Sequence, residues 1–378
     1  MSRLLHIYRR YYPDEGGIES TMRAFCEYAR GQGDEVTALV SSPRPWSQRR
    51  QYQGVEVVRA ASVGTVANTP VCPGMPAWIN RLKPDLVEVH HAYPYGMWAV
   101  QKSGFKGPLI VHYHFDISRF GTLQRLIAPT LYGTLARADR IFVNSRSYAE
   151  SSVTLEGFLD KCVYIPAGVA PMRFALMPNV QEKAAQLRRE DRFRVLFVGR
   201  LSHYKGLEHL VAAMAHVDGE LNIVGRGKIA LTLEQLAAML DISDRVHLLG
   251  RLPEEDLLAQ YYAADAVVLP SVSRGESFGV TQVEAMLCGR PVVCSDLPGV
   301  CEVGSEETTA LFPAGDVAAL AEQLNRLKDD ARLRQRMGEA GRQRALAEYD
   351  VDKLNARRWQ VYQELLSGER EAVADGAG

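Results

Sequence analysis

The sequence predicts an α/β protein built from two doubly wound, parallel-sheet domains. Short apolar segments of strand length alternate with longer segments of helical periodicity, which is the pattern of a parallel sheet covered by helices. This alternation runs through the chain twice, with a break between the two series. The chain of 378 residues is also longer than one hydrophobic core usually serves.

The first series lies before residue 166, with helical segments such as Glu19–Arg30 between most of its strands. The expected strands are Leu4–Tyr8, Val36–Val40, Val55–Arg59, Leu86–His90, Leu109–Tyr113, Arg140–Asn144 and Cys162–Ile165. Each is a short apolar run of the kind found in a buried parallel sheet.

The second series follows a break in residues 166–192, which are rich in proline and charge. Its expected strands are Arg194–Val198, Leu221–Val224, Val246–Leu249, Ala266–Leu269, Val292–Cys294 and Thr309–Phe312. Its expected helices are Leu207–Met214, Leu233–Leu240, Glu254–Tyr262, Val280–Leu287, Ala318–Leu327, Arg332–Glu348 and Val351–Leu366. We therefore expect domains at residues 1–170 and 171–350, and a disordered tail at 368–378.

The composition describes a soluble globular protein. Hydrophobic residues make up 47% and charged residues 24% of the chain, and no apolar run approaches the ~20 residues of a membrane span. The first residues run directly into a strand pattern and lack the apolar region of a secretory signal. The six cysteines have no Cys-x-x-Cys spacing, so we expect core cysteines in the reducing cytoplasm.

Charge is divided unevenly between the two halves of the chain. Residues 1–178 hold 20 Lys and Arg against 14 Asp and Glu, and residues 179–378 hold 24 against 31. A basic first half suits an anionic acceptor or an anionic surface, although ordinary scatter of surface charge explains the numbers equally well. No nucleic-acid recognition motif accompanies the basic residues, so no nucleic-acid partner is expected.

Two basic and aromatic segments of the first half leave an alternative open. Ile117–Arg140 has apolar residues at helical spacing interrupted by arginines, and Pro43–Tyr52 combines Trp and Arg in an expected loop. Such segments rest on anionic membranes, which would add a peripheral contact with the inner membrane to a cytoplasmic location. We favour the alternative, a packed helix whose arginine side chains reach solvent.

Two glutamates stand out in the second half. Glu276 lies in a glycine-rich loop, and Glu284 follows inside the apolar helical segment Val280–Leu287. A solvated helix face would repeat its charge every three or four residues, and this segment does not. A buried carboxylate without a partner is costly, so a polar ligand is the expected partner of these glutamates.

Two loops after expected strands of the second half have features of an anion site. The loop Gly199–Gly206 carries Arg200 and Lys205 between a strand and a helix, where cations and helix N-terminal amides favour a diphosphate. A solvated charged turn is the alternative. The loop Gly225-Arg226-Gly227 follows the next strand, and its glycines would let the backbone approach a ligand.

The Gly225 loop also matches the Gly-x-Gly-x-x-Ala variant of the dinucleotide fingerprint. An acidic residue is missing where an NAD site has one, and Arg251 follows the next strand instead, which would suit NADP. The fingerprint also lies in the second strand–helix unit of its domain, whereas the usual site lies in the first. A dehydrogenase is therefore the less favoured alternative.

The ordered set of these motifs resembles the retaining glycosyltransferases of family four, which have the GT-B fold. The segment Glu276-Ser277-Phe278-Gly279 to Glu284-Ala285 is similar to their E-x7-E motif, and "VLFVGRLSHYKGLEHLV", "LNIVGRGK" and "LCGRPVVCSDLPGVCEVG" occupy the family's order around it. The first half is similar more loosely, through "YYPDEGGIES", "VHYHFDI", "ADRIFVNSRSYAE" and "VYIPAGV". The resemblance implies two Rossmann-like domains facing a central cleft, with the C-terminal helix 351–367 packing back on the first domain.

The resemblance also implies roles for individual residues. Arg200 and Lys205 would bind the donor diphosphate. Glu276 would hold hydroxyls of the transferred sugar, and Glu284 would hold the ribose. The implied catalytic residues are His114, which matches the family's histidine beside the sugar, with Glu276, Arg200 and Lys205. The other implied donor-binding residues are Gly16, Gly17, Gly199, Gly225, Gly227, Arg251, Phe278, Gly279 and Val280.

His112, His114 and Asp116 alternate along one expected strand and so resemble a metal site. The strand ends about here, which would splay the three side chains. The resemblance also requires no metal, so none is expected. His90 and His91 we interpret as packing at a strand end.

As a whole, the resemblance implies a retaining hexosyltransferase that moves a sugar from a nucleotide diphosphate donor to a saccharide or lipid-linked saccharide acceptor, without a cofactor. "YYPDEGGIE" and the His-x-His-x-Asp strand look most like bacterial mannosyl- and deoxyhexosyltransferases of O-antigen or exopolysaccharide assembly, which favours a GDP-linked donor. Two alternatives stay open. They are another GT-B enzyme, such as an epimerase or a phosphorylase, and a non-catalytic partner that binds a nucleotide sugar.

Overall fold

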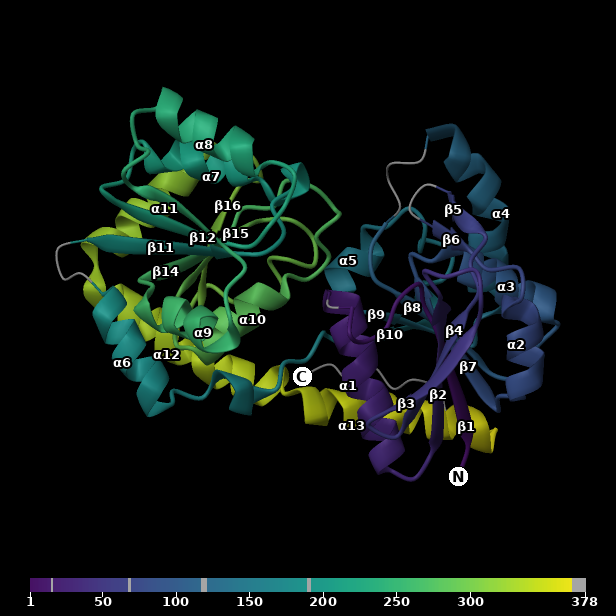
Figure 1. Ribbon diagram of the computed structural model, residues 1–378. Coiled ribbons are helices and arrows are strands. Elements are labelled where there is room, and N and C mark those ends of the chain that lie inside the picture. The colour runs from purple at the N-terminus through teal and green to yellow at the C-terminus, as the bar shows by residue number, and fades with distance from the viewer. Residues whose placement is uncertain (15, 67–68, 117–120, 189–191, 369–378) are drawn as a thin grey trace. The chain divides into compact units, whose positions relative to one another are not determined.

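The computed structural model describes residues 1–14, 16–66, 69–116, 121–188 and 192–368 (Figure 1). It divides the chain into two compact units. The N-terminal unit is Met1–Gly168 together with Val351–Gly378, and the C-terminal unit is Val169–Asp350. The chain therefore crosses between the units twice, and each unit is described by itself below.

The N-terminal unit is built on an eight-stranded sheet with the order β10-β9-β8-β7-β1-β2-β4-β3. Its strands are β1 (Arg3–Ile7), β2 (Glu35–Ser41), β3 (Gln48–Tyr52), β4 (Val55–Ala60), β7 (Leu86–His91), β8 (Leu109–Tyr113), β9 (Arg140–Val143) and β10 (Cys162–Tyr164). All neighbours pair in parallel except β3 with β4. The strand order reverses beside β1, which makes the edge beyond β1 and β7 the expected place for a ligand.

Helices cover this sheet, and the last of them comes from the end of the chain. The other elements of the unit are α1 (Gly17–Gly31), β5 (Gly64–Val66), β6 (Thr69–Val71), α2 (Met75–Leu82), α3 (Pro94–Ser103), α4 (Gly121–Arg137), α5 (Arg146–Glu150) and η1 (Leu159–Lys161). Helix α13 (Val351–Ser367) lies beside α1 (Figure 1). Asn355 donates to the carbonyl of Ala24 over 3.3 Å, and Trp359 donates to Asp34 over 2.9 Å, so α13 is bonded to this unit at both points.

The C-terminal unit has a parallel sheet of order β13-β12-β11-β14-β15-β16, the strand order of a dinucleotide-binding fold. Its strands are β11 (Phe193–Val198), β12 (Gly219–Val224), β13 (Val246–Gly250), β14 (Ala266–Leu269), β15 (Val292–Ser295) and β16 (Thr309–Phe312). Its helices are η2 (Pro171–Phe174), α6 (Pro178–Leu187), η3 (His203–Lys205), α7 (Leu207–Met214), α8 (Ala230–Met239), α9 (Glu254–Ala263), α10 (Val280–Leu287), α11 (Val317–Asp329) and α12 (Ala331–Glu348). The predicted fold class is confirmed, with two helix-covered sheets that are parallel except at the edge strand β3.

The prediction of a loop over Pro43–Tyr52 was wrong for its second half, because Gln48–Tyr52 forms the edge strand β3. The propensity of "QRRQY" for a strand is weak, and pairing with β4 decides its structure. Arg49 donates to Glu56 of β4 over 2.8 Å. Charged side chains are typical of an edge strand, since they oppose further strand pairing.

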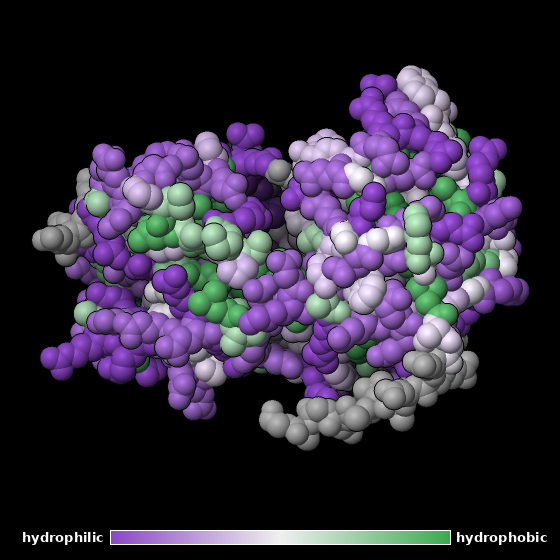
Figure 2. Space-filling model, turned by 90° about the horizontal axis from the view of Figure 1, so that it is seen from below, coloured by the Kyte–Doolittle hydropathy of each residue, from purple (hydrophilic) through white to green (hydrophobic). Residues whose placement is uncertain are grey.

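The helix expected over Ile117–Arg140 is α4, and residues 117–120 and the tail beyond 368 lie outside the described residues. Leu135 is buried, and Arg137 donates to the carbonyls of Phe105 and Gly107, each over 2.8 Å. These contacts favour the packed alternative for this end of the helix. The face of the molecule shown in Figure 2 is largely hydrophilic, with hydrophobic residues in patches between polar ones. None of the helices within the described ranges is both long and apolar enough to cross a bilayer.

The six cysteines are free thiols. Five are buried, and Cys301 is partly buried. The interpretation of the cysteines as core residues is therefore confirmed for those five.

Candidate functional site

The predicted donor-binding residues of the C-terminal unit gather at the carboxyl edge of its sheet. The strand order reverses between β11 and β14, and loops beyond such a reversal bind the ligands of open α/β sheets. Arg200 and Lys205 follow β11, and Glu276 follows β14. The glycines of the Gly225 loop follow β12, and Arg251 follows β13.

Lys205 and Glu276 form an ion pair at this reversal. Lys205 Nζ donates to Glu276 Oε2, and Ser271 Oγ donates to the same oxygen over 3.3 Å. The Lys205 and Glu276 side chains are 10% and 12% exposed. Burial opposes the charge of Lys205, but the carboxylate of Glu276 outweighs burial and raises the pKa of Lys205 above its ordinary value. Glu276 therefore has a partner within the protein, which the sequence did not reveal, and the expected polar ligand stays a prediction.

Glu284 also has an internal partner. It lies in α10, and its Oε2 accepts a hydrogen bond of 2.6 Å from the hydroxyl of Tyr261 in α9. Burial raises the pKa of Glu284 above its ordinary value. Burial, together with the neighbouring Glu284, raises the pKa of Tyr261 well above its ordinary value, so this hydroxyl stays a donor. Sequence reasoning missed Tyr261, because a tyrosine in an apolar helix is most often a core residue.

Gly279 starts α10 in a left-handed conformation, with φ of +83°. A Cβ added there would lie 2.3 Å from the Leu269 side chain, so the position requires glycine. This turn places the amino end of α10 beside Glu276, with Phe278 buried behind it and Val280 opening the helix. The unpaired amides of a helix start favour an anion.

The glycines of the Gly225 loop have a structural explanation within the protein. A Cβ added at Gly225 would lie 1.8 Å from the carbonyl oxygen of Gly199, and one added at Gly227 would lie 1.9 Å from that of Leu201. The amide of Gly199 donates to Val224 over 2.9 Å. The loops after β11 and β12 thus pack backbone against backbone. The glycine pattern therefore needs no dinucleotide to explain it.

The other three predicted site residues belong to the N-terminal unit. Gly16 and Gly17 follow β1 and open α1. A Cβ added at Gly16 would meet the Glu19 carboxylate at 2.4 Å, whereas one added at Gly17 would meet nothing within 4 Å. Packing within the protein therefore gives no reason for glycine at position 17. His114 follows β8 and is buried.

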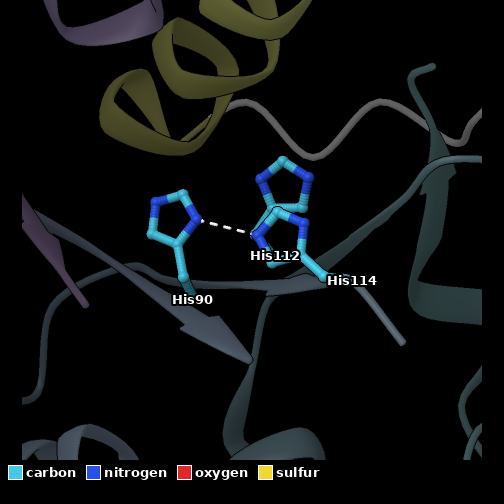
Figure 3. Close-up of side chains that lie close together, drawn as sticks. All are labelled: His90, His112 and His114. Atoms are coloured by element: carbon cyan, nitrogen blue, oxygen red, sulfur yellow. Dashed lines mark hydrogen bonds between the residues drawn. The ribbon is translucent and has the colours of Figure 1, made fainter. Parts of the chain in front are cut away.

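His114 belongs to a buried histidine cluster that sequence reasoning missed (Figure 3). His90 of β7 points toward His114, and the His90 Nδ1 and His114 Nε2 atoms are 3.0 Å apart. The two rings are nearly parallel, at 6°, with centroids 5.3 Å apart. His112 stacks on His114 at 4.1 Å. The sequence places His90 and His112 in successive expected strands, but only the structure shows that they pair in register on neighbouring strands.

In this structure the rings of the cluster are hydrogen-bonded to each other and stacked. Ring nitrogens of His90, His112 and His114 lie within 4.8 Å of one another. The expectation that no metal binds these histidines stays a prediction. Asp116, which the sequence grouped with His112 and His114, accepts hydrogen bonds from the hydroxyls of Tyr113 and Ser152, each over 2.6 Å.

Comparison with known proteins assigns both units to one kind of enzyme. Residues 179–344 match the family Glycosyl transferases group 1, and residues 16–168 match the Glycosyl transferase 4-like domain. The phosphatidyl-myo-inositol mannosyltransferase of Mycobacterium leprae is 30% identical over 386 residues, which cover 95% of this chain and 96% of that protein.

Two further relatives have similar coverage. The O-antigen chain mannosyltransferase C of Escherichia coli is 27% identical and covers 97% of this chain and 100% of its own length. The D-rhamnosyltransferase WbpZ of Pseudomonas aeruginosa is 29% identical over 89% of each chain.

Solved structures show the same fold. Sucrose-phosphate synthase from Thermosynechococcus elongatus matches with a TM-score of 0.82 at 23% identity, over 98% of this chain and 100% of that chain. HepE of Anabaena, solved with UDP and glucose, matches with a TM-score of 0.79 at 20% identity, over 96% and 100% of the two chains. The chain therefore belongs to the group 1 glycosyltransferases and has their GT-B fold.

Proposed function

We propose that this glycosyltransferase moves mannose or a related deoxyhexose from a GDP-linked donor to a saccharide or lipid-linked saccharide acceptor of a cell-surface polysaccharide. The transfer retains the anomeric configuration and needs no metal. The names of the relatives support the sugar class, since they include two mannosyltransferases and a D-rhamnosyltransferase. The resemblance of "YYPDEGGIE" supports the GDP-linked donor.

The observation that carries the proposal is the Lys205–Glu276 pair at the reversal of the strand order. A nucleotide diphosphate sugar offers an anion and a set of hydroxyls side by side. In the structure the cation and the carboxylate satisfy each other. When the donor binds, Lys205 leaves Glu276 and donates, together with Arg200, to the diphosphate oxygens. Glu276 then accepts hydrogen bonds from the sugar hydroxyls.

In this arrangement the same cations can stabilise the leaving group of the transfer reaction. The bond between the anomeric carbon and the diphosphate oxygen breaks, and negative charge develops on the leaving diphosphate. The acceptor oxygen forms the new bond, and its proton leaves with the nucleotide. Lys205, Arg200 and the amino end of α10 stabilise the developing charge, which is the role of a metal ion in other enzymes.

Glu284 holds the nucleotide at the ribose. Its Oε2 is occupied by the Tyr261 hydroxyl, so Tyr261 orients the carboxylate and leaves Oε1 for a ribose hydroxyl. A ribose is common to all nucleotides, so Glu284 does not distinguish one base from another.

A thermal-shift comparison tests this function. GDP and GDP-mannose are expected to stabilise the protein more than UDP, UDP-glucose, ADP or NADPH. A ligand at ~100 times its Kd adds about 2.7 kcal/mol, and each kcal/mol raises the Tm of a protein of this size by roughly 2–4 °C. A shift with UDP-sugars alone would overturn the GDP assignment, and a shift with NADPH alone would overturn the donor site itself.

A further inference from the structure

Polar side chains from three strands share one buried face of the N-terminal sheet. His6 of β1 pairs in register with Glu88 of β7, and His90 of β7 pairs with His112 of β8. His114 follows two residues later on the same side. All five are buried. A charged group in such a position must be neutralised by a partner, because burying an isolated charge is costly.

Helix α13 supplies that partner. Arg358 lies over the rings of Phe25 and Phe142, at 4.1 and 5.5 Å from their centroids, and donates to Glu88 Oε1. Tyr362 donates to Glu88 Oε2. Burial opposes ionisation of Glu88, but Arg358 and the neighbouring histidines outweigh it and hold the pKa of Glu88 well below its ordinary value. Glu88 is therefore a carboxylate, which only accepts hydrogen bonds.

The carboxylate in turn fixes the protons of the histidines. His112 Nδ1 donates to Glu88 Oε1 over 3.1 Å. His90 Nε2 lies 3.2 Å from the same oxygen, although the two atoms do not meet the geometry of a hydrogen bond. A bare nitrogen lone pair facing an anionic oxygen at this distance would be repelled, so the proton of His90 belongs on Nε2. Burial lowers the pKa of His90 and of His114 well below the ordinary value, so both rings are neutral.

A neutral ring has one proton, and this decides the next bond. His90 with its proton on Nε2 has a bare Nδ1, which accepts a hydrogen bond. The atom 3.0 Å away is His114 Nε2, which must then be the donor. His114 consequently has its proton on Nε2 and a bare Nδ1.

We propose that Glu88, held by Arg358 and Tyr362, is a positioning residue that fixes His114 as the neutral tautomer with its proton on Nε2. The inference rests on the proposed function, together with the family resemblance that implies a place for His114 beside the donor sugar. There, Nδ1 of His114 accepts a hydrogen bond from a sugar hydroxyl and gives no proton. The C-terminal helix thus sets the hydrogen-bonding polarity of a residue that is far from it in the sequence.

The test is long-range ¹H–¹⁵N correlation NMR of the full-length protein with ¹⁵N-labelled histidine. The chain has nine histidines, and a His114→Gln variant identifies the signals of His114. In the wild-type protein at neutral pH, His114 is expected as a neutral ring protonated on Nε2. A ring protonated on Nδ1, or an imidazolium, would overturn the proposal without any variant.

Glu88→Gln sharpens the test, because it removes the negative charge that favours a proton on His90 Nε2, while the amide oxygen still accepts from Arg358. Without that charge His90 can carry its proton on Nδ1, and His114 is expected to change tautomer. Trp359→Phe is the matched control, since it removes the bond of α13 to Asp34 and leaves Glu88 untouched. The tautomer of His114 should stay unchanged in this control. An unchanged tautomer in Glu88→Gln, or the same change in both variants, would contradict the relay.

Transfer kinetics give the second measurement. Glu88→Gln is expected to lower kcat about ten- to hundredfold with little change in KM for the donor, as loss of a hydrogen bond to a charged group does. Trp359→Phe should keep the wild-type kcat. The NMR measurement needs no transfer reaction. A protein that binds no donor would therefore refute the proposed function and still reveal the tautomer.

Discussion

The two units each contain a glutamate paired with a cation, and the two pairs differ in almost every physical respect. Lys205 and Glu276 join two loops at a sheet edge, and their side chains are 10% and 12% exposed. Arg358 and Glu88 join a helix to the centre of a sheet, and their side chains are 3% and 0% exposed. The first pair has few other bonds, whereas the second is enclosed by aromatic rings, a tyrosine and histidines.

The difference indicates what each pair does. A lysine is a compact charge on a flexible stem, so Lys205 can leave Glu276 for an arriving diphosphate at low cost. An arginine fixed between rings cannot leave a buried carboxylate without exposing an unpaired charge in the core. The C-terminal pair is therefore suited to exchange its partner, and the N-terminal pair is suited to hold a geometry.

The largest expected effect is acid unfolding of the N-terminal unit before the C-terminal unit. Burial lowers the pKa of His6 and His91 from 6.5 to about 4, whereas none of the four histidines of the C-terminal unit is buried. The unfolded chain binds protons below pH 6.5 and the folded unit does not, so stability is complete above that pH and falls toward pH 4. Each of these two histidines lowers the free energy of unfolding by roughly 3 kcal/mol as the pH falls from about 6.5 to about 4.

Fluorescence separates the two units in this experiment. All four tryptophans, Trp46, Trp78, Trp98 and Trp359, belong to the N-terminal unit. Tryptophan emission is expected to change at a higher pH than the far-UV circular dichroism of the whole chain. His6→Phe removes one titrating group and should shift the fluorescence midpoint to lower pH. Coincident transitions in the wild-type protein would show that the two units do not differ in this way.

The next effect compares the two cations directly. Arg358→Met leaves the Glu88 carboxylate in the core without its cation, and should lower the free energy of unfolding by about 3–5 kcal/mol. Lys205→Met should lower it by only about 1–3 kcal/mol, because Glu276 keeps the Ser271 hydroxyl and some solvent. Urea unfolding of both variants measures the difference. Equal losses would contradict the distinction between an exchanging and a fixed pair.

A smaller effect concerns the nucleotide end of the donor site. Glu284→Ala removes one hydrogen bond to a charged group and should weaken nucleoside diphosphate binding about ten- to hundredfold. Tyr261→Phe removes only the orienting hydroxyl and should weaken it less. Isothermal titration calorimetry gives both values. Unchanged affinity in Glu284→Ala would remove the ribose role.

The smallest expected effect is that of a chelator. If Lys205 and Arg200 neutralise the leaving diphosphate, excess EDTA should leave the rate of sugar transfer unchanged. Loss of transfer in EDTA, with recovery on adding Mg²⁺ or Mn²⁺, would assign that role to a metal.

The fold followed from the sequence because its signals are local. Apolar strands such as "LIVHY" and glycine-bounded helices such as Val280–Leu287 are visible within a short window, and both were predicted with the right bounds. The edge strand Gln48–Tyr52 was missed because its pairing with β4, not its composition, makes it a strand. Local pattern reveals elements that bury one face, and it says little about an exposed edge.

The candidate site could be predicted from the sequence only in part, because its contacts, like the pairing of the edge strand, are not local. Loop motifs identified Lys205 and Glu276 separately, but their pairing joins residues 71 positions apart and depends on the strand order. The bond between Arg358 and Glu88 spans 270 positions, and a single arginine in an amphipathic helix gives no sign of it. Residues that act through a partner are invisible until the fold brings the partner to them.

The most direct test of the donor site is calorimetric titration of the best-stabilising nucleoside diphosphate into three proteins. The exchange of Lys205 from Glu276 to the diphosphate predicts that Lys205→Met weakens binding about ten- to hundredfold relative to the wild type. Glu276→Gln, which frees Lys205 in advance, should bind the diphosphate as tightly as the wild type or more tightly, although it transfers little sugar. Equal weakening in Lys205→Met and Glu276→Gln would contradict the exchange and leave the pair a structural bond.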